Sequence, residues 1–319
     1  MSKLTMREAK QIQELLSKSK NILILLHRSP DGDTIASSLA LELYLSRIGK
    51  HADLAVNDEI PEVFKFLLTE VEVKRDFLLG DYDLIFAVDC GDAVRTGFPA
   101  RLEQIAKTKP LINIDHHFKN SLHKIAKLNL VDEKASAAAE IIYELLVEFG
   151  AKIDSKLATY ILAGIYYDTG GFQHSNVTER TLKITSECVR CGGRINLIAK
   201  NISSSKKTAG LKLWGIALKK MKIKRNGVVY TYLTSRDLEI AGASAEDASG
   251  IVNLINTVPE SRIAVLLIET PDGKIKASLR TEDDLVDVSK LARLFDGGGH
   301  RKAAGFTFDG SMANLLGKK

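Results

Sequence analysis

Near its start, this sequence contains an apolar run that ends in a cluster of ionisable residues. Residues 21–26 read Asn-Ile-Leu-Ile-Leu-Leu, with no polar alternation after the first position. Such a run is typical of a strand that is buried on both faces, as in the parallel sheets of α/β proteins. His27 follows directly, and Asp31 and Asp33 lie in the loop beyond it. The sequence therefore predicts a buried strand whose carboxyl end carries a histidine and two aspartates.

The strand pattern recurs along the first half of the chain. An amphipathic helix is predicted over residues 6–19, and helical spacing returns over 34–48 until Gly49, a typical stop signal. Further short β-prone runs are predicted at 52–56, 84–88 and 111–114, and two alanine-rich helices are predicted at 135–149 and 155–167. This alternation predicts a mostly parallel sheet that is flanked by helices.

The second half of the chain has a different pattern. At 319 residues the chain exceeds the usual size of one domain. Residues 185–224 are predicted to be helical and increasingly basic, without a strand signal. Strands are then predicted at 228–234, 262–269 and 274–280. We therefore expect an α/β protein with three parts: a catalytic domain at 1–188, a helical linker at 189–222 and a smaller α/β domain at 223–319.

Composition bears on location more than on chemistry. No apolar run approaches the roughly 18–20 residues that span a bilayer, and residues 1–10 are polar and amphipathic. Three cysteines are too few for a disulfide framework and suit a reducing compartment. We therefore expect a cytoplasmic protein without a membrane partner. The formal net charge of +5 is compatible with a phosphate-rich substrate but does not argue for one.

Carboxylates and imidazoles follow three of the predicted strands at the same end. They are His27, Asp31 and Asp33 after the first of these strands, Asp89 after the second, and Asp115, His116 and His117 after the third. Because the carboxyl ends of parallel strands share one edge of a sheet, where ligands bind, we expect these side chains to meet in one crevice. So many carboxylates would repel one another and take up protons unless a cation neutralised them.

The residue types indicate which ions the crevice would hold. Imidazole and carboxylate without thiolate suit Mn²⁺, Fe²⁺, Zn²⁺ or Mg²⁺, and the oxygen-rich balance favours Mn²⁺ or Mg²⁺. Five or more ligands exceed what one ion needs. Two ions about 3.5–4 Å apart that share a bridging aspartate would use them all. We therefore expect two divalent ions, with Mn²⁺ favoured and Mg²⁺ or Co²⁺ as alternatives.

Five ordered motifs resemble those of the DHH phosphoesterases and of their DHH-associated second domain. They are the HxxxDxD spacing from His27 to Asp33, the isolated Asp89, the triplet Asp115-His116-His117, Asp168 in Tyr167-Asp168-Thr169-Gly170, and the glycine-rich segment 297–305. Together they cover nearly the whole chain. The compact length is similar to that of the nanoRNase and 3′,5′-bisphosphate nucleotidase (pAp phosphatase) branch.

The resemblance implies a role for each residue of the first domain. One ion would be held by His27, Asp31 and Asp89, and the other by Asp33, Asp89, His116 and Asp168. Asp89 would then bridge the two ions. His117 would face the substrate phosphate or assist the leaving group, and Asp115 would accept a hydrogen bond from a ligand histidine. The expected catalytic residues are thus His117, Asp115 and Asp89.

The resemblance also assigns the substrate phosphate to the second domain. Gly297, Gly298 and Gly299 would let the backbone approach it closely, so that amide groups cradle it. His300 would add a side-chain donor, and the planar fork of Arg280 would clamp a phosphate. Substrate would lie in the cleft between the domains, which favours short oligonucleotides over long strands.

The implied function is a metal-dependent phosphoesterase that degrades short oligoribonucleotides, namely nanoRNA and linear dinucleotides, to mononucleotides, and that also acts on pAp-type substrates. Three enzymatic alternatives stay open: a RecJ-like single-strand exonuclease, a cyclic dinucleotide phosphodiesterase and an inorganic pyrophosphatase. The alternative from another class is a nucleotide-binding sensor that uses the same surface without turnover. A homodimer is a further expectation from the resemblance.

Each motif also has an ordinary structural interpretation. A lone aspartate after a strand, such as Asp89, is usually a turn or helix-cap residue. Asp31-Gly32 alone is an ordinary turn signal, and Gly170-Gly171 is an ordinary helix stop. The functional interpretation therefore depends on the combination of all these residues with the histidine pair.

Overall fold

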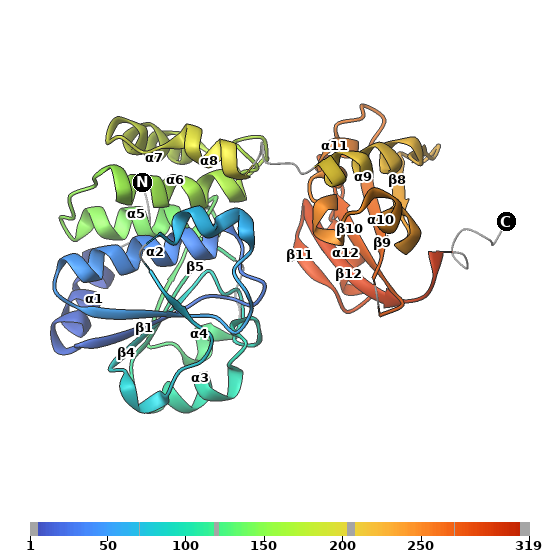
Figure 1. The fold of residues 1–319 in the computed structure, drawn as a ribbon. Helices are drawn as coiled ribbons and strands as arrows, with labels where there is room; N and C mark the ends of the chain where they lie inside the picture. The colour runs from blue at the N-terminus through green and yellow to red at the C-terminus, as the bar shows by residue number, and fades with distance from the viewer. Residues whose placement is uncertain (1–5, 70, 118–120, 203–207, 271, 313–319) are drawn as a thin grey trace. The chain divides into compact units, whose positions relative to one another are not determined.

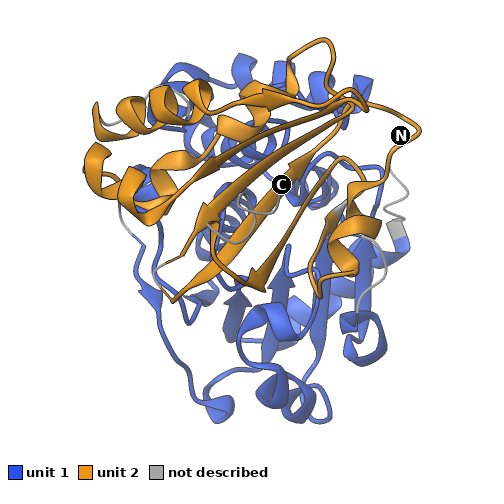
Figure 2. Ribbon diagram, turned by 90° about the vertical axis from the view of Figure 1, so that its right-hand side faces the viewer, with its two compact units in different colours: residues 1–205 blue, residues 206–319 orange. Residues whose placement is uncertain are grey.

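Two separate sheets organise this chain, one in each of two units. The computed structural model describes residues 6–69, 71–117, 121–202, 208–270 and 272–312. Contacts divide the chain into unit 1, residues 1–205, and unit 2, residues 206–319 (Figure 2). Unit 1 holds a parallel sheet with helices, and unit 2 holds a smaller sheet with helices. The predicted α/β fold class is confirmed.

The sheet of unit 1 has six strands in the order β3-β2-β1-β4-β5-β6. The strands are β1 (Asn21–Leu25), β2 (His51–Ala55), β3 (Val73–Lys74), β4 (Leu84–Val88), β5 (Leu111–Asp115) and β6 (Leu128–Val131). Every neighbouring pair runs parallel. The strand order reverses direction between β1 and β4, and this switch point is where open α/β sheets bind ligands.

Helices cover both faces of this sheet, which explains why its strands are apolar throughout. Ile22 and Ile24 of β1 belong to one core cluster, whereas Leu23 and Leu25 belong to the other. Figure 1 shows α1, α2, α5 and α6 over one face and α3 and α4 over the other, with α7 and α8 packed on α6. The helices are α1 (Met6–Lys18), α2 (Gly32–Arg47), α3 (Pro99–Ile105), α4 (Leu122–Ile125), α5 (Ala138–Glu148), α6 (Ser155–Asp168), α7 (Glu179–Arg190) and α8 (Ile195–Ile202).

Helix α2 begins earlier than the sequence predicts. The side chain of Asp31 accepts hydrogen bonds from the backbone N–H groups of Asp33, at 3.1 Å, and Thr34, at 3.2 Å. An aspartate at this position satisfies amide groups that have no partner within the first turn of a helix. Asp33 therefore lies in the first turn of α2 and not in the preceding loop, where we expected it.

Unit 2 contains a mixed sheet in the order β11-β12-β10-β9-β8-β7. Its elements are α9 (Thr208–Lys219), β7 (Lys222–Ile223), β8 (Val228–Leu233), α10 (Ser235–Ala241), α11 (Ile251–Asn256), β9 (Ile263–Glu269), β10 (Lys274–Arg280), α12 (Val288–Arg293), β11 (Gly298–His300) and β12 (Ala303–Asp309). β8 and β9 are parallel, and the other pairs are antiparallel.

The segment between the two sheets differs from the prediction in one respect. We expected no strand within 185–224, but β7 forms there because Lys222 and Ile223 pair with the edge of β8. Within the predicted linker 189–222, α8 belongs to unit 1 and α9 belongs to unit 2. Among the described helices, none combines the length and the apolar character that crossing a membrane requires.

Candidate metal centre

His27 follows β1 and is buried, with 2% of its surface exposed. Its Nδ1 lies 2.7 Å from the backbone oxygen of Arg28. If Nδ1–H donates to this oxygen, the lone pair of the neutral ring is on Nε2. Nε2 lies 3.5 Å from Asp31 Oδ1 and 3.9 Å from Asp89 Oδ2, and within the described part of the chain it has no hydrogen-bond partner. A buried nitrogen of this kind, aimed at two carboxylates, is suited to bind a cation.

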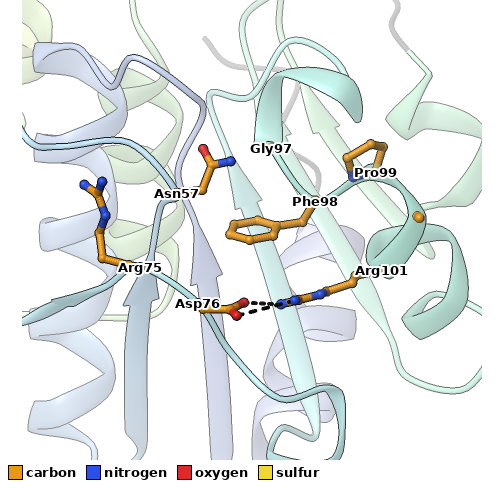
Figure 3. Close-up of a pocket in the computed structure, with 8 residues that line it drawn as sticks. Asn57, Arg75, Asp76, Gly97, Phe98, Pro99 and Arg101 are labelled. Carbon is orange, nitrogen blue, oxygen red and sulfur yellow. Dashed lines mark hydrogen bonds and ion pairs between the residues drawn. The ribbon is translucent and has the colours of Figure 1, made fainter.

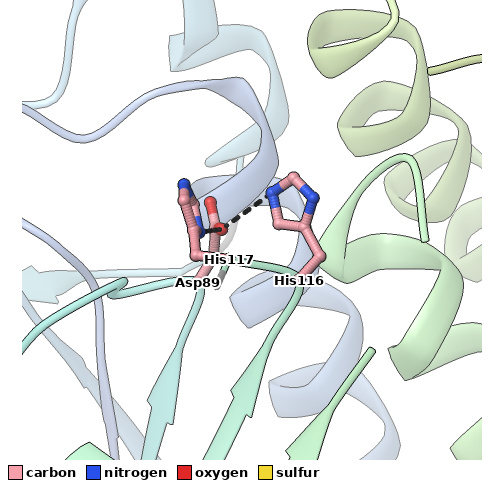
Figure 4. A group of neighbouring side chains, drawn as sticks. All are labelled: Asp89, His116 and His117. Carbon is pink, nitrogen blue, oxygen red and sulfur yellow. Dashed lines mark ion pairs between the residues drawn. The ribbon is translucent and has the colours of Figure 1, made fainter. Parts of the chain in front are cut away.

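Asp89 lies between histidines that come from different strands. Its Oδ2 faces His27, whereas its Oδ1 lies 3.4 Å from His116 Nε2 and 3.3 Å from His117 Nδ1 (Figure 4). Asp89 is almost fully buried, and its backbone has a left-handed φ of 57°. Aspartate and asparagine adopt this conformation more readily than other residues with a side chain, for which it costs roughly 1–2 kcal/mol. The turn after β4 therefore holds this carboxylate in a defined position.

His116 connects the strand end to helix α6. Its Nδ1 lies 3.3 Å from the backbone oxygen of Ala135, so this ring too can present Nε2 toward the carboxylates. Nε2 lies 3.1 Å from Asp168 Oδ2 and 4.0 Å from Asp33 Oδ2. Asp168 is the last residue of α6, so one carboxylate of this group comes from a helix end rather than from a strand end.

Asp33 is fully buried, and it also stabilises another helix. Its carboxylate accepts hydrogen bonds from the backbone N–H groups of Ala138, at 2.5 Å, and Ala139, at 3.1 Å. Ser37 Oγ donates a third hydrogen bond at 2.8 Å. Helix α5 has Ala137 at its N-cap position, which supplies no side-chain cap. Asp33 therefore takes the place of the missing cap of α5, where the helix dipole also favours a negative charge.

All six predicted metal ligands lie in one region of unit 1. Among the described residues, three groups of side chains each have ligand atoms within 4.8 Å of one another: His27 with Asp31 and Asp89, Asp33 with His116 and Asp168, and Asp89 with His116 and His117. Asp89 and His116 each belong to two groups. The fold of unit 1 thus brings side chains from four separate segments of the sequence into one cluster of imidazoles and carboxylates.

The two most buried carboxylates of this cluster have opposite pKa shifts. Burial, together with the charges of Asp89 and Asp168, raises the pKa of Asp33 well above its ordinary value. Burial would raise the pKa of Asp89 as well, but hydrogen bonds from His116 and His117 hold it well below the ordinary range. Without a cation, Asp33 would thus tend to hold a proton while Asp89 stays ionised.

The histidines of the cluster bind protons more strongly than ordinary histidines do. Burial lowers the pKa of His27, but the close contact with the Asp31 carboxylate and the charges of Asp31 and Asp89 outweigh this and raise the pKa. For His116 the pKa is raised well above its usual value, because Asp168 and Asp89 outweigh burial. A divalent cation would displace these protons, which is the behaviour expected of a metal site.

Asp115 contacts His117, the histidine that we assigned to the substrate. Its Oδ1 lies 2.7 Å from His117 Nδ1 and accepts the backbone N–H of His117 at 2.9 Å, while Oδ2 accepts the N–H of Gly91 at 2.7 Å. Burial lowers the pKa of His117, but hydrogen bonds to Asp115 and Asp89 raise it to about 9. Asp115 thus orients His117, whereas we expected it to accept a hydrogen bond from a ligand histidine.

The predicted phosphate-binding residues lie in unit 2. Arg280 ends β10 and donates hydrogen bonds to Asn253 Oδ1, at 3.0 Å, and to the backbone oxygen of Leu279, at 2.9 Å. His300 ends β11, where its backbone pairs with Ala303. A side chain at Gly297 or Gly299 would collide with β12, whereas one at Gly298 would meet nothing within 4 Å. Packing against the neighbouring strand therefore explains two of the three glycines without a ligand.

A separate pocket in unit 1 contains none of the predicted site residues (Figure 3). It is lined by Asn57, Arg75, Asp76, Gly97, Phe98, Pro99, Ala100 and Arg101. The guanidinium of Arg101 pairs with Asp76 and stacks on the rings of Phe77 and Phe98, 5.3 and 5.5 Å from their centres. The charged groups of Asp76 and Arg101 thus have structural partners, and we assign no chemistry to this pocket.

Gly164 is a residue of this centre that sequence reasoning missed. It lies in the middle of α6, where a Cβ atom would be 2.5 Å from Asp33 Oδ1 and 2.7 Å from the Cβ of Ala139. Only a glycine lets α6 approach the carboxylate so closely. A glycine in the middle of a predicted helix, beside a motif residue such as Asp168, is the signal that could have revealed this contact.

Gly164→Ala is expected to destabilise unit 1 by about 1–3 kcal/mol, because the added methyl group overpacks the contact with Asp33. This sign is opposite to the usual gain of up to ~1 kcal/mol for glycine-to-alanine changes within helices. Gly215→Ala in α9 is a matched control, since nothing lies within 4 Å of its Cβ position. Urea denaturation measures both changes, and a more stable Gly164→Ala protein would contradict the predicted collision.

The comparisons with known proteins agree with the class of fold and site described above. A model of the DHH family, N-terminal domain, matches residues 21–165, and a model of the DHHA1 domain matches residues 225–317. The bifunctional oligoribonuclease and PAP phosphatase NrnA of Thermus thermophilus is 30% identical over 290 residues, which cover 91% of this chain and 84% of that protein. The protein of the same name from Bacillus subtilis is 30% identical over 288 residues, 88% of each chain.

The fold has a similar solved structure over almost its entire length. The crystal structure of an exopolyphosphatase-related protein from Bacteroides fragilis matches with a TM-score of 0.91 at 24% identity, and the match covers 99% of this chain and 96% of that one. Fold and site together define a metal-dependent hydrolase of phosphoester bonds. This chain belongs to the DHH family and carries a DHHA1 domain. The resemblance seen in the sequence motifs is thereby confirmed.

Proposed function

We propose that this protein hydrolyses phosphodiester bonds in short oligoribonucleotides and linear dinucleotides, releasing mononucleotides, and that it also removes phosphate from pAp-type nucleotides. Two relatives that are 30% identical over most of their length carry the name oligoribonuclease and PAP phosphatase. The single observation that carries the proposal is the position of Asp89. One of its carboxylate oxygens faces His27 and the other faces His116 and His117, as a bridge between two cations requires.

We propose two divalent ions, with Mn²⁺ favoured. His27, Asp31 and Asp89 would hold one, and Asp33, Asp89, His116 and Asp168 would hold the other. The four carboxylates of this set carry a formal charge of −4, which two divalent cations would neutralise. Imidazole nitrogens and carboxylate oxygens together bind Mn²⁺ better than they bind the softer ions that prefer thiolates. When bound, two such ions lower the pKa of a water molecule and withdraw charge from a phosphate.

The protein's own residues would bind and orient the reacting phosphate. We propose that Asp115 holds the ring of His117 through Nδ1, so that Nε2 faces the phosphate or the leaving oxygen. A histidine whose pKa is raised to about 9 in the metal-free protein can carry a proton at neutral pH. It can therefore donate a hydrogen bond to a phosphate oxygen or a proton to the leaving group.

Unit 2 would supply the contacts that select a phosphorylated nucleotide. We propose that Arg280, which Asn253 holds in position, binds a substrate phosphate through its guanidinium. The open side of Gly298 leaves room for a ligand beside the backbone of β11. His300 follows in the same strand and would add a donor. Selection for short substrates is part of this proposal.

Turnover of a substrate panel tests the proposed function. Metal-stripped protein should release mononucleotides from di- to pentaribonucleotides, and phosphate from pAp, only after Mn²⁺ is added. Degradation of a long single-stranded DNA faster than of a dinucleotide would favour a RecJ-like exonuclease, and phosphate release from pyrophosphate would favour a pyrophosphatase. Opening of a cyclic dinucleotide is a separate arm of the panel. Tight binding of these ligands without turnover under Mn²⁺, Mg²⁺ or Co²⁺ would instead indicate a sensor.

Arg280→Ala is expected to raise KM for a diribonucleotide about 10- to 100-fold while kcat changes little, because a charge-assisted hydrogen bond contributes roughly 1.5–3 kcal/mol to binding. Lys276→Ala, on the same strand but exposed, is the control and should leave KM unchanged. Steady-state kinetics at saturating Mn²⁺ measures both constants. An unchanged KM in Arg280→Ala would remove Arg280 from the proposed substrate site.

A further inference from the structure

Glu140 is a fully buried carboxylate that the proposed reaction does not use. It lies in the first turn of α5, and its Oε2 is 3.4 Å from Arg180 Nε. Arg180 comes from α7 and also contacts Asp132 at 2.5 Å and Glu144 at 2.7 Å. Three carboxylates from two segments thus share the guanidinium of Arg180, whose side chain is 18% exposed. The buried charge of Glu140 needs a partner of opposite charge, because leaving it unpaired is strongly unfavourable.

The other oxygen of Glu140 connects this ion cluster to the loop before α5. Ser136 Oγ donates a hydrogen bond to Glu140 Oε1 at 2.5 Å, and both residues are fully buried. The same loop is anchored at its start, where Ala135 N–H donates to the backbone oxygen of Asp132 at 3.0 Å. The loop from 132 to 139 is therefore fixed at both ends by partners of Arg180.

This loop contacts two of the proposed ligands through its backbone. The carbonyl oxygen of Ala135 lies 3.3 Å from His116 Nδ1, and the amide groups of Ala138 and Ala139 donate to the two oxygens of Asp33. Backbone groups of one short segment thus set the ring orientation of His116 and the position of the Asp33 carboxylate. Both residues belong to the same candidate group, Asp33 with His116 and Asp168.

We propose that Arg180, acting through Glu140 and Ser136, is a positioning residue that orients the backbone of residues 135–139 and thereby sets the affinity of the Asp33–His116–Asp168 site for its cation. The inference rests on the proposed two-ion function. The His27–Asp31–Asp89 site has no contact with this loop among the hydrogen bonds and ion pairs described above. The network should therefore act on one cation site and not on the other.

Mn²⁺ binding to the metal-stripped protein tests this inference without any turnover. Free Mn²⁺ can be counted by electron paramagnetic resonance during a titration with Mn²⁺ alone. Ser136→Ala removes the hydroxyl that connects Glu140 to the loop, and Arg180→Lys keeps the charge but loses the planar fork that reaches three carboxylates. Each variant should bind one Mn²⁺ as the unmodified protein does and the second about 10-fold more weakly, the usual effect of losing an outer-shell partner.

Glu144→Gln is the matched control. It removes another carboxylate partner of Arg180 from the same helix, but Glu144 makes no contact with Ser136 among the described hydrogen bonds. It should lower the melting temperature without changing either Mn²⁺ affinity. The proposal is overturned if Ser136→Ala binds both ions within twofold of the unmodified protein, or if Glu144→Gln weakens the second ion equally. If Arg180→Lys does not fold, Ser136→Ala alone decides.

A failure of the proposed function would look different from a failure of this inference. If the unmodified protein binds fewer than two Mn²⁺ or hydrolyses no member of the substrate panel, the function itself is wrong. If it binds two and is active while Ser136→Ala binds both ions unchanged, only the positioning role is wrong. The double variant Ser136→Ala/Arg180→Lys adds a second check. Both substitutions interrupt the same series of contacts, so together they should weaken binding of the second ion no more than the larger single effect.

Discussion

Asp89→Asn is expected to lower kcat on a diribonucleotide by at least ~10³-fold, since a bridging carboxylate supports both cations and their charge stabilisation amounts to several kcal/mol. Asparagine is the appropriate replacement because it tolerates the left-handed backbone at φ 57° and keeps the size of the side chain. Alanine would add backbone strain, so a loss of activity could come from a less stable fold as well as from the missing carboxylate. Steady-state kinetics at saturating Mn²⁺ measures the loss.

The control for this variant is Asp81→Asn, which changes an exposed carboxylate of unit 1. It should retain the activity of the unmodified protein. Because the Asp89 carboxylate pairs with His116 and His117, Asp89→Asn should lower the melting temperature in the absence of metal, so both proteins are assayed well below that transition. Activity of Asp89→Asn within tenfold of the unmodified protein would show that the bridge is not needed.

Two bound Mn²⁺ ions are expected to raise the melting temperature of metal-stripped unit 1 by about 10–20 °C. An ion at a hundred times its dissociation constant contributes about 2.7 kcal/mol per site, and each kcal/mol shifts a domain of this size by about 2–4 °C. Calorimetry on the full chain with and without Mn²⁺ measures the shift. The transition of unit 2, which holds none of the proposed ligands, serves as an internal control.

The same shift should grow as pH rises from 6.5 to 9. In the metal-free protein the pKa of His117 is raised to about 9, and the pKa values of His27 and His116 are also raised. These histidines stabilise the folded state fully below the ordinary histidine pKa, and this stability is lost as pH rises through the folded values. Because the cation replaces these protons, its effect increases over the same range. A shift that decreases toward pH 9 would contradict this assignment.

The sequence was sufficient to predict the layers of unit 1 and the edge at which its polar residues gather. Strands that are buried on both faces leave a continuous apolar signal, and β1, β4 and β5 follow that signal closely. Polar residues directly after such strands could be placed at a common edge without knowing the strand order. The order itself, with β1 beside β4, depends on packing between distant segments, and no local pattern encodes it.

Other features were not predictable because their causes are not local. β12, with the sequence Ala-Ala-Gly-Phe-Thr-Phe-Asp, is rich in small residues and forms a strand through pairing with β10 and β11. Several partners of Asp33 and His116 are backbone groups of alanines, and backbone groups carry no signature in the sequence. The contact of Asp115 with His117 depends on side-chain orientation in the turn after β5.

The capping of α5 by the Asp33 carboxylate has a practical consequence for choosing an inactive form of this protein. A substitution there would loosen the start of a helix as well as a cation site, so a lost reaction could not be separated from a misplaced loop. For trapping an uncleaved nucleotide in crystals, a change at His27 is preferable. Its side chain contacts only its own loop and Asp89 among the described interactions, so the surrounding architecture should persist.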